Sequence, residues 1–224
     1  MEYKKITFED IKNNYEVKTY IKYADKVMEA MGYTEHSFAH VTKTAVNAAT
    51  ILSRLGYDER TVELAKIAAY MHDIGNVVNR YNHAHSGALM AFRILGEMGM
   101  DPEEASIIVS AIGNHDENSA SAVNEIAAAL ILADKSDVRR TRVRAREYAV
   151  DFDIHDRVNH AVYESDLILS TEDKTVTLNL HIDTSQCSVM EYFEIFIGRM
   201  LLCRRAAEFL DLRFKLIING AELL

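Results

Sequence analysis

A histidine and an aspartate stand side by side, as His72-Asp73, in the segment AAYMHDIGN (residues 68–76), at the end of an apolar helical run. Burying two such groups together costs free energy unless a cation or hydrogen bonds compensate. The partial negative charge of a helix C-terminus favours a cation at this position. Imidazole and carboxylate together suit manganese, iron, cobalt, nickel or zinc better than calcium. The dyad therefore indicates a metal site.

Further histidines and aspartates recur at the ends of other apolar segments: His40, His83, His115 and Asp134. His40 would stand in the first turn of a helix whose inward stripe includes Ala48, so its ring should point inward as well. The run 126–133 is apolar on every side and should be buried, which delivers the carboxylate of Asp134 to the interior. These side chains predict one metal site assembled from five helices.

Helical periodicity dominates the chain up to about residue 150. It predicts helices over about 20–31, from 38 to Gly56, over 59–74 with the dyad in the last turn, from 83 onward, over 102–113, and through 126–133. In the helix that begins near residue 83, Leu89, Phe92 and Leu95 are expected to face inward. Asp101-Pro102 is a strong helix start, because an N-cap residue precedes proline at the first helical position.

The pattern changes after about residue 160. Residues 167–170 and 175–182 are predicted to be strands joined by a hairpin turn, and the second alternates with period two. A helix over 190–210 and a strand over 213–218 complete a β-β-α-β unit. We therefore expect a mainly α chain: a helical metal-binding domain over 1–158, with a small α+β subdomain over 159–224 packed on it.

Length, charge and composition limit the classes of protein to which this chain can belong. The 224 residues suffice for one large domain, or for a medium domain with an appendage. A formal net charge of −9 argues against a nucleic-acid partner. Cys187 and Cys203 form no disulfide or zinc-ribbon pattern and are expected to be small buried residues. No apolar run reaches membrane-spanning length and the N-terminus is polar, so we expect a cytoplasmic protein with no membrane partner. A homo-oligomer remains open.

The order His40, His72-Asp73, Asp134 resembles the HD superfamily of metal-dependent phosphohydrolases, which is named for this dyad. The segments 71–75 (MHDIG) and 132–135 (LADK) match its usual helix end and its final aspartate motif, and the resemblance covers about residues 20–145. It implies an HD-type helical bundle in which these residues hold one divalent metal.

A subset of the superfamily binds two or more metals through additional histidines. His83, four residues before Gly87-Ala88, and His115-Asp116 are similar to the motifs of that subset. The resemblance implies that Asp73 bridges to a second metal held with His83 and His115. His83 and His85 are about 200° apart on a helix, so only one of them can face the site, and the glycine spacing favours His83. Asp116 is expected to bind the second metal or to accept a proton.

Two well-known branches are disfavoured. The Gly-Tyr-Pro segment of the HD-GYP phosphodiesterases is replaced by Asn118-Ser119-Ala120, and the Glu-Asp pair that follows the dyad in alarmone hydrolases is missing. His36 lies one turn before His40 and is a further candidate ligand, the alternative being an exposed or capping histidine.

A basic run follows Asp134. On a helix, Arg139, Arg142 and Arg146 would share one face that could reach a substrate phosphate. The alternative is a solvated face whose arginines pair with nearby carboxylates. Lys135, adjacent to the last ligand, is the better single candidate for phosphate contact.

The resemblance implies an enzyme that hydrolyses a phosphate ester or anhydride in a small nucleotide-like metabolite through a water activated by one or two divalent metals (manganese, iron, cobalt, nickel or zinc, with magnesium as an alternative). Asp73, Asp116 and Lys135 would be its catalytic residues. Dinucleoside polyphosphates, nucleoside monophosphates and cyclic nucleotides stay open as substrates, in that order. The rival hypothesis is an HD-fold nucleotide-binding or regulatory module without turnover.

Overall fold

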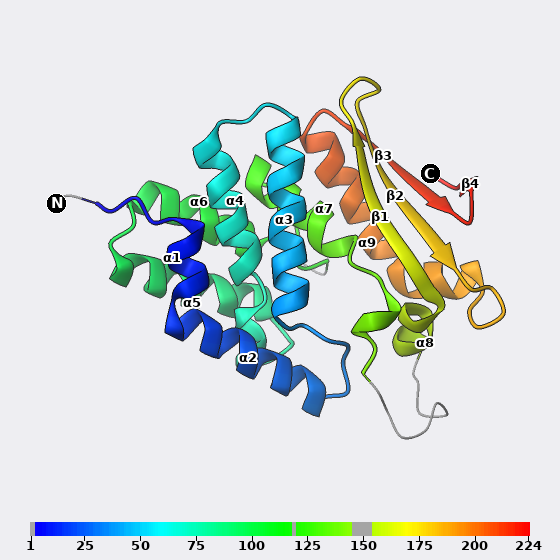
Figure 1. Cartoon of the computed structure of the whole chain (residues 1–224), viewed down its shortest axis with the longest axis horizontal. Coiled ribbons are helices and arrows are strands. Elements are labelled where there is room, and N and C mark those ends of the chain that lie inside the picture. Colours follow the sequence, from blue (N-terminus) through cyan, green and yellow to red (C-terminus); the bar gives the residue numbers. More distant parts are fainter. Residues whose placement is uncertain (1–2, 118–119, 145–153) are drawn as a thin grey trace.

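A group of N-terminal helices lies beside a C-terminal sheet in the computed structural model, which describes residues 3–117, 120–144 and 154–224 (Figure 1). The N-terminal helices are α1 (Phe8–Asn13), α2 (Tyr15–Ala30), α3 (Phe38–Arg54), α4 (Glu59–Met71), α5 (His83–Met98), α6 (Pro102–Gly113) and α7 (Glu125–Lys135). Most of these helices begin at a side-chain cap that accepts a backbone hydrogen bond: Thr7, Asn14, Ser37, Asp58, Asp101 and Asn124.

Helix α7 lies at the centre of the bundle. Every residue from Ile126 to Ala133 is buried, and the helix contacts α3, α4, α6 and α9. An all-apolar helix has no solvent-facing side, so its position in the core follows from its sequence. The prediction of a buried helix over 126–133 is confirmed, and Asp134 follows directly from this core.

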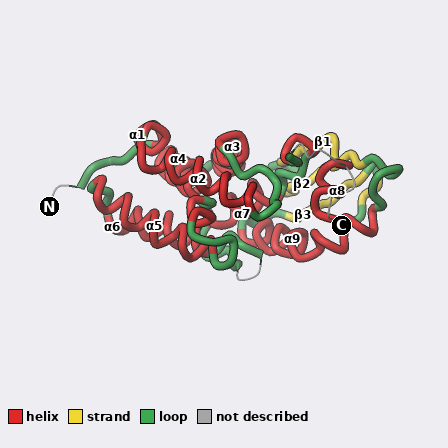
Figure 2. The backbone as a smooth tube through the Cα atoms, turned by 90° about the horizontal axis from the view of Figure 1, so that it is seen from below, coloured by secondary structure: helices red, strands yellow, loops and turns green. Residues whose placement is uncertain are grey.

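The C-terminal part contains α8 (Ile154–Ala161), β1 (Val162–Ser170), β2 (Thr175–Ile182), α9 (Val189–Phe209), β3 (Arg213–Ile218) and β4 (Ala221–Glu222). The strand order is β1-β2-β3-β4. β1 pairs with β2 in antiparallel fashion, and β2 pairs with β3 in parallel through the α9 crossover. Helix α9 covers one face of this sheet (Figure 2). The predicted β-β-α-β order is confirmed, and β4 extends it.

One hydrophobic core runs through both parts of the chain. Residues of α4 and α7 and residues of β2 and α9 belong to the same buried cluster. Helix α8 spans the boundary predicted at 158/159. Cys187 and Cys203 are buried and unpaired, as predicted. In the part of the chain that the structure describes, no helix combines the length and apolar character needed to cross a membrane.

The inward face predicted for α5 is wrong in part. Leu95 is buried, but Leu89 is 71% and Phe92 is 59% exposed. The helix instead turns a face rich in small residues inward, including Gly87, Ala88 and Ala91. Small side chains let α5 approach its neighbours closely, and this close packing outweighs the burial of larger apolar groups on the other face.

The dyad lies just beyond α4 rather than in its last turn. The helix ends at Met71, His72 is its C-cap, and a 3₁₀ turn spans Ile74–Val77. This turn crosses α5 where Gly75 of the turn lies against Gly87 of the helix. A Cβ atom on Gly75 would overlap the His83 carbonyl oxygen and the Gly87 backbone nitrogen and would lie 2.9 Å from the Gly87 Cα. Glycine at 75 therefore lets the backbones that carry His72 and His83 come together.

We expect Gly75→Ala to destabilise the fold by about 1–3 kcal/mol, the cost of overpacking a core, because the new methyl group meets backbone atoms that cannot rotate away. Denaturant unfolding followed by circular dichroism measures this. Gly96→Ala in α5 is the matched control, since its Cβ meets nothing within 4 Å, and it should be neutral or stabilising by up to about 1 kcal/mol. Equal midpoints for Gly75→Ala and the wild type would show that the crossing tolerates a side chain.

Candidate metal centre

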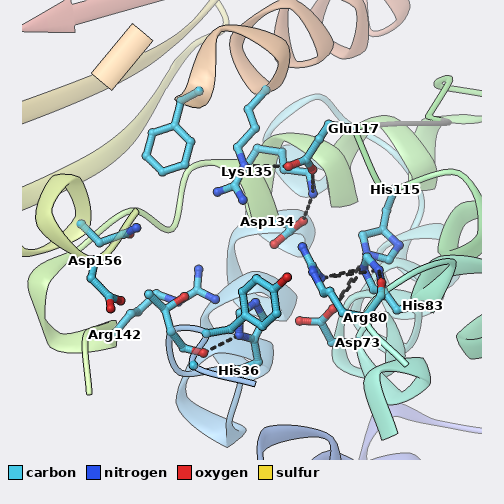
Figure 3. Close-up of a pocket in the computed structure, with 16 residues that line it drawn as sticks. His36, Asp73, Arg80, His83, His115, Glu117, Asp134, Lys135, Arg142 and Asp156 are labelled. Carbon is cyan, nitrogen blue, oxygen red and sulfur yellow. Dashed lines mark hydrogen bonds and ion pairs between the residues drawn. The ribbon is translucent and has the colours of Figure 1, made fainter. Parts of the chain in front are cut away.

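A cavity of about 160 Å³ opens between α5, α7, α8, α9 and the segments that follow α2, α4 and α6. Figure 3 shows Asp73, His83 and His115 on one side of it and Arg142 and Asp156 on the other. The rings of His40 and His72 lie behind this wall and are fully buried. Charged and polar side chains dominate the lining, which favours a charged ligand.

Four histidines have their Nδ1 atoms fixed in the same way. Each Nδ1 lies within hydrogen-bonding distance of an oxygen: His40 of Asp137 Oδ2 (2.8 Å), His72 of Ala69 O (2.7 Å), His83 of Arg80 O (3.0 Å) and His115 of Ile112 O (2.6 Å). A carbonyl or carboxylate oxygen can only accept, so each Nδ1 must donate its hydrogen. In the neutral imidazole, Nε2 then carries a lone pair.

The Nε2 atoms converge on the carboxylates of Asp73 and Asp134. His40 Nε2 lies 3.3 Å from Asp134 Oδ1 and 3.6 Å from Asp73 Oδ2. His72 Nε2 lies 3.3 Å from Asp73 Oδ2 and 3.7 Å from Asp134 Oδ1. The second pair faces the other oxygen of Asp73, with Nε2 to Oδ1 distances of 3.5 Å for His83 and 4.0 Å for His115. Asp73 thus lies between two pairs of histidines.

The geometry of the cluster calls for positive charge. His40 Nε2 and His72 Nε2 are buried and have no hydrogen-bond partner among the described residues. His83 Nε2 and His115 Nε2 lie 3.1 Å apart, and two lone pairs at that distance repel unless a cation lies between or beside them. Arg80 Nη1 donates to His83 Nε2 at 3.2 Å, so one positive group already adjoins this pair. Imidazole and carboxylate ligands at these positions suit a divalent transition metal.

Electrostatics at the dyad lead to the same requirement. Burial lowers the pKa of His72, but the neighbouring carboxylates of Asp73 and Asp134 outweigh it and raise the pKa to about 10. Burial raises the pKa of Asp73, yet His72 holds it well below its usual range. In the protein alone, a proton on His72 therefore balances the buried carboxylates, and a metal would take the place of that proton.

The sequence comparison assigns the family. Residues 37–159, more than half of the chain, match the family model of the HD domain. This chain belongs to the HD domain family. We call the cluster of His40, His72, Asp73, His83, His115 and Asp134 the HD centre.

Two proteins are similar to this chain over part of their length. The uncharacterized protein MJ1020 of Methanocaldococcus jannaschii is 25% identical over 198 residues, covering 79% of this chain and 76% of that protein. The crystal structure of a predicted HD superfamily hydrolase from an uncultured Thermotogales bacterium is similar at 28% identity, with a TM-score of 0.44, over 55% of this chain and 67% of that chain.

Asp137 is a functional candidate that the sequence analysis missed. Its side chain is fully buried and accepts hydrogen bonds from His40 Nδ1 (2.8 Å), Lys43 Nζ (2.9 Å) and Arg139 Nε (2.8 Å). Burial raises its pKa, but the His40 hydrogen bond and the Arg142 guanidinium outweigh burial and hold it well below the usual range. An ionised Asp137 orients His40 and raises the basicity of its Nε2. The spacing of three residues from Asp134 was the available signal.

Two of the predicted phosphate-contacting residues, Lys135 and Arg142, lie at the cavity. Lys135 is buried, lines the cavity, and pairs with Asp134 and Glu117 at 2.8 Å each. Arg142 is also buried and lines the cavity, and it donates to the carbonyl oxygens of Glu35 (2.9 Å) and Asp137 (2.8 Å).

The helical face predicted for the basic run is wrong. Helix α7 ends at Lys135, and in the described segment up to residue 144 the regular structure that follows is a 3₁₀ turn over Arg140–Arg142. Arg139 lies outside the cavity lining and pairs with Asp137, since the backbone here is irregular and does not repeat every 3.6 residues. Arg146 lies outside the described residues.

The remaining candidate residues differ in burial and in the cavity that they line. His83 is buried in the HD centre, whereas His85 is exposed and lines a neighbouring cavity with Asp116. Asp116 does not line the cavity of the HD centre. His36 does line it, half-buried, with its Nδ1 donating to the Thr34 carbonyl oxygen at 2.7 Å. His36 is therefore neither fully exposed nor a helix cap.

Adding Mn²⁺ or Co²⁺ to chelator-treated protein should raise its melting temperature. A ligand at a hundred times its Kd stabilises the native state by about 2.7 kcal/mol, which corresponds to roughly 5–10 °C for a chain of this size. Asp134→Asn should lose this shift, and Asp166→Asn on exposed β1 should keep it. An unchanged melting temperature with every transition metal tried would argue against a metal site.

Asp137→Asn should weaken metal binding by about 10–100-fold, the usual effect of removing the carboxylate behind a ligating histidine. Cobalt titration followed by visible absorbance measures it. Lys43→Met is the matched control, because it removes another partner of Asp137 and leaves the His40 bond intact. Equal cobalt affinities for wild type and Asp137→Asn would mean that Asp137 has no part in orienting His40.

Proposed function

We propose that this HD-domain protein is a metal-dependent phosphohydrolase that cleaves a phosphate ester or anhydride in a small nucleotide-like molecule. The observation that carries the proposal is the convergence of two carboxylates with two buried Nε2 atoms that have no hydrogen-bond partner among the described residues, next to a cavity lined by charged side chains. A structural histidine cluster would satisfy these atoms internally. A hydrolytic site leaves them available.

The residues divide between two metal positions. His40, His72, Asp73 and Asp134 would hold one ion, and His83, His115 and Asp73 would hold a second. The second ion would displace Arg80 from its contact with His83 Nε2. Bound divalent ions lower the pKa of water and neutralise charge on phosphoryl oxygens.

The cavity charges favour an anionic substrate. Within the described part of the chain, four cationic and four carboxylate side chains line the cavity, so they balance one another. Each divalent ion adds positive charge to this balanced set, and a phosphoryl group supplies the matching negative charge. Lys135 and Arg142, the buried cations of the lining, are suited to orient it through charge-assisted hydrogen bonds. Both side chains also occupy space beside the phosphoryl group that water would otherwise fill, and water there would screen the phosphoryl charge.

The cavity itself is small. At about 160 Å³ it suits a phosphoryl group together with the metal ions, while the rest of the substrate would extend toward the opening. A nucleotide-like leaving group is compatible with that arrangement, because only its phosphate needs to reach the HD centre.

A screen of phosphate esters and anhydrides with added manganese, iron or cobalt tests the proposal. Wild-type protein should hydrolyse at least one of them. Asp73→Asn should reduce the rate by about a hundredfold or more, because replacing a metal ligand costs more than replacing a residue that only hydrogen-bonds to a ligand. Asp166→Asn should behave like the wild type. A metal-loaded protein that hydrolyses none of them, or that keeps full activity as Asp73→Asn, would refute catalysis at this site. The regulatory module would instead bind a nucleotide without turnover.

A further inference from the structure

The C-terminal subdomain also reaches the cavity. Phe196 and Arg199 lie three residues apart on α9, so they share one helical face, and both line the cavity. Helix α9 packs against α7, the helix that carries Asp134 and Lys135 (Figure 1). A helix outside the bundle thus places an arginine at the cavity.

The Arg199 guanidinium is held in place by two contacts. Its Nε donates to Glu117 Oε1 at 3.0 Å, and its central carbon lies 4.5 Å from the centroid of the Phe196 ring. Such a cation–π contact orients the planar group as well as stabilising it. The terminal Nη1 and Nη2 groups have no hydrogen-bond partner among the described residues. Arg199 therefore presents unused donors in a fixed orientation.

Glu117 connects this arginine to the HD centre. Its Oε2 lies 2.8 Å from Lys135 Nζ, which in turn lies 2.8 Å from Asp134 Oδ2. Asp134, Lys135, Glu117 and Arg199 thus form a row of alternating charge. Burial raises the pKa of Glu117, but Lys135 and Arg199 outweigh burial and keep the carboxylate ionised. The ionised Glu117 can hold both cations at the cavity wall.

We propose that Arg199 is a substrate-contacting residue whose terminal N–H groups bind a phosphoryl oxygen, with Glu117 and Phe196 positioning it. The inference rests on the proposed function for the identity of the ligand as a phosphoryl group. Guanidinium suits this role because its fork of donors matches phosphate oxygens. The α+β subdomain then completes the substrate site and is more than an appendage to it.

Binding of inorganic phosphate to metal-loaded protein, measured by calorimetry, tests the role directly. Arg199→Met should weaken phosphate binding about tenfold or more, the loss expected for a hydrogen bond to a charged group, and should raise KM for a phosphate substrate by a similar factor. Arg199→Lys keeps the charge without the fork and should recover part of the affinity. Cobalt affinity should stay at the wild-type value in both variants.

Arg204→Met is the matched control, because Arg204 lies on the same helix, is about half exposed, and pairs only with Glu208 among the described residues. It should bind phosphate like the wild type. Wild-type phosphate affinity in Arg199→Met, or no phosphate binding by the metal-loaded wild type, would overturn the proposal. If Arg199→Met does not fold, Arg199→Lys with unchanged phosphate affinity would overturn it as well.

The two proposals can fail separately. A wild-type protein that binds phosphate through Arg199 but hydrolyses no phosphate compound with any metal would refute the proposed function and leave the anion site standing. Active protein with the same phosphate affinity and KM in wild type and Arg199→Met would refute the role of Arg199 alone.

Discussion

Hydrogen bonds at imidazole Nδ1 determine what the HD centre can bind. Each Nδ1 of His40, His72, His83 and His115 donates to an oxygen that cannot donate in return, so all four Nε2 atoms face Asp73 or Asp134. Such a concentration of acceptors in the interior is unfavourable by itself. A cation in their midst removes the cost, and the same cation would provide the chemistry.

Apolar and small residues of the fold bring the ligands together. The buried helix α7 delivers Asp134 from the core, and the close approach of Gly75 to α5 brings His72 and His83 together. Asp137 then fixes His40 from the outer side. Metal affinity and fold stability are coupled as a result, because the ligands belong to separate helices that must all be in place.

Features encoded locally were predictable from the sequence. The helix start at Asp101, the all-apolar α7 and the alternating β2 follow from caps and periodicity. The failures have a common cause in tertiary contacts. Smaller residues, and not Leu89 and Phe92, form the buried face of α5. The helix α7 ends at Lys135, before the basic run. Arg199 carries no motif, since only the packing of α9 on α7 brings it to the cavity.

Anomalous diffraction from crystals soaked in cobalt tests the central claim most directly. We expect an anomalous peak at about 2.0–2.2 Å from the Nε2 atoms of His40 and His72 and from carboxylate oxygens of Asp73 and Asp134, the usual range for such ligands to a transition metal. Cobalt found only at surface carboxylates, or imidazole rings rotated so that Nε2 points away from Asp73, would contradict it.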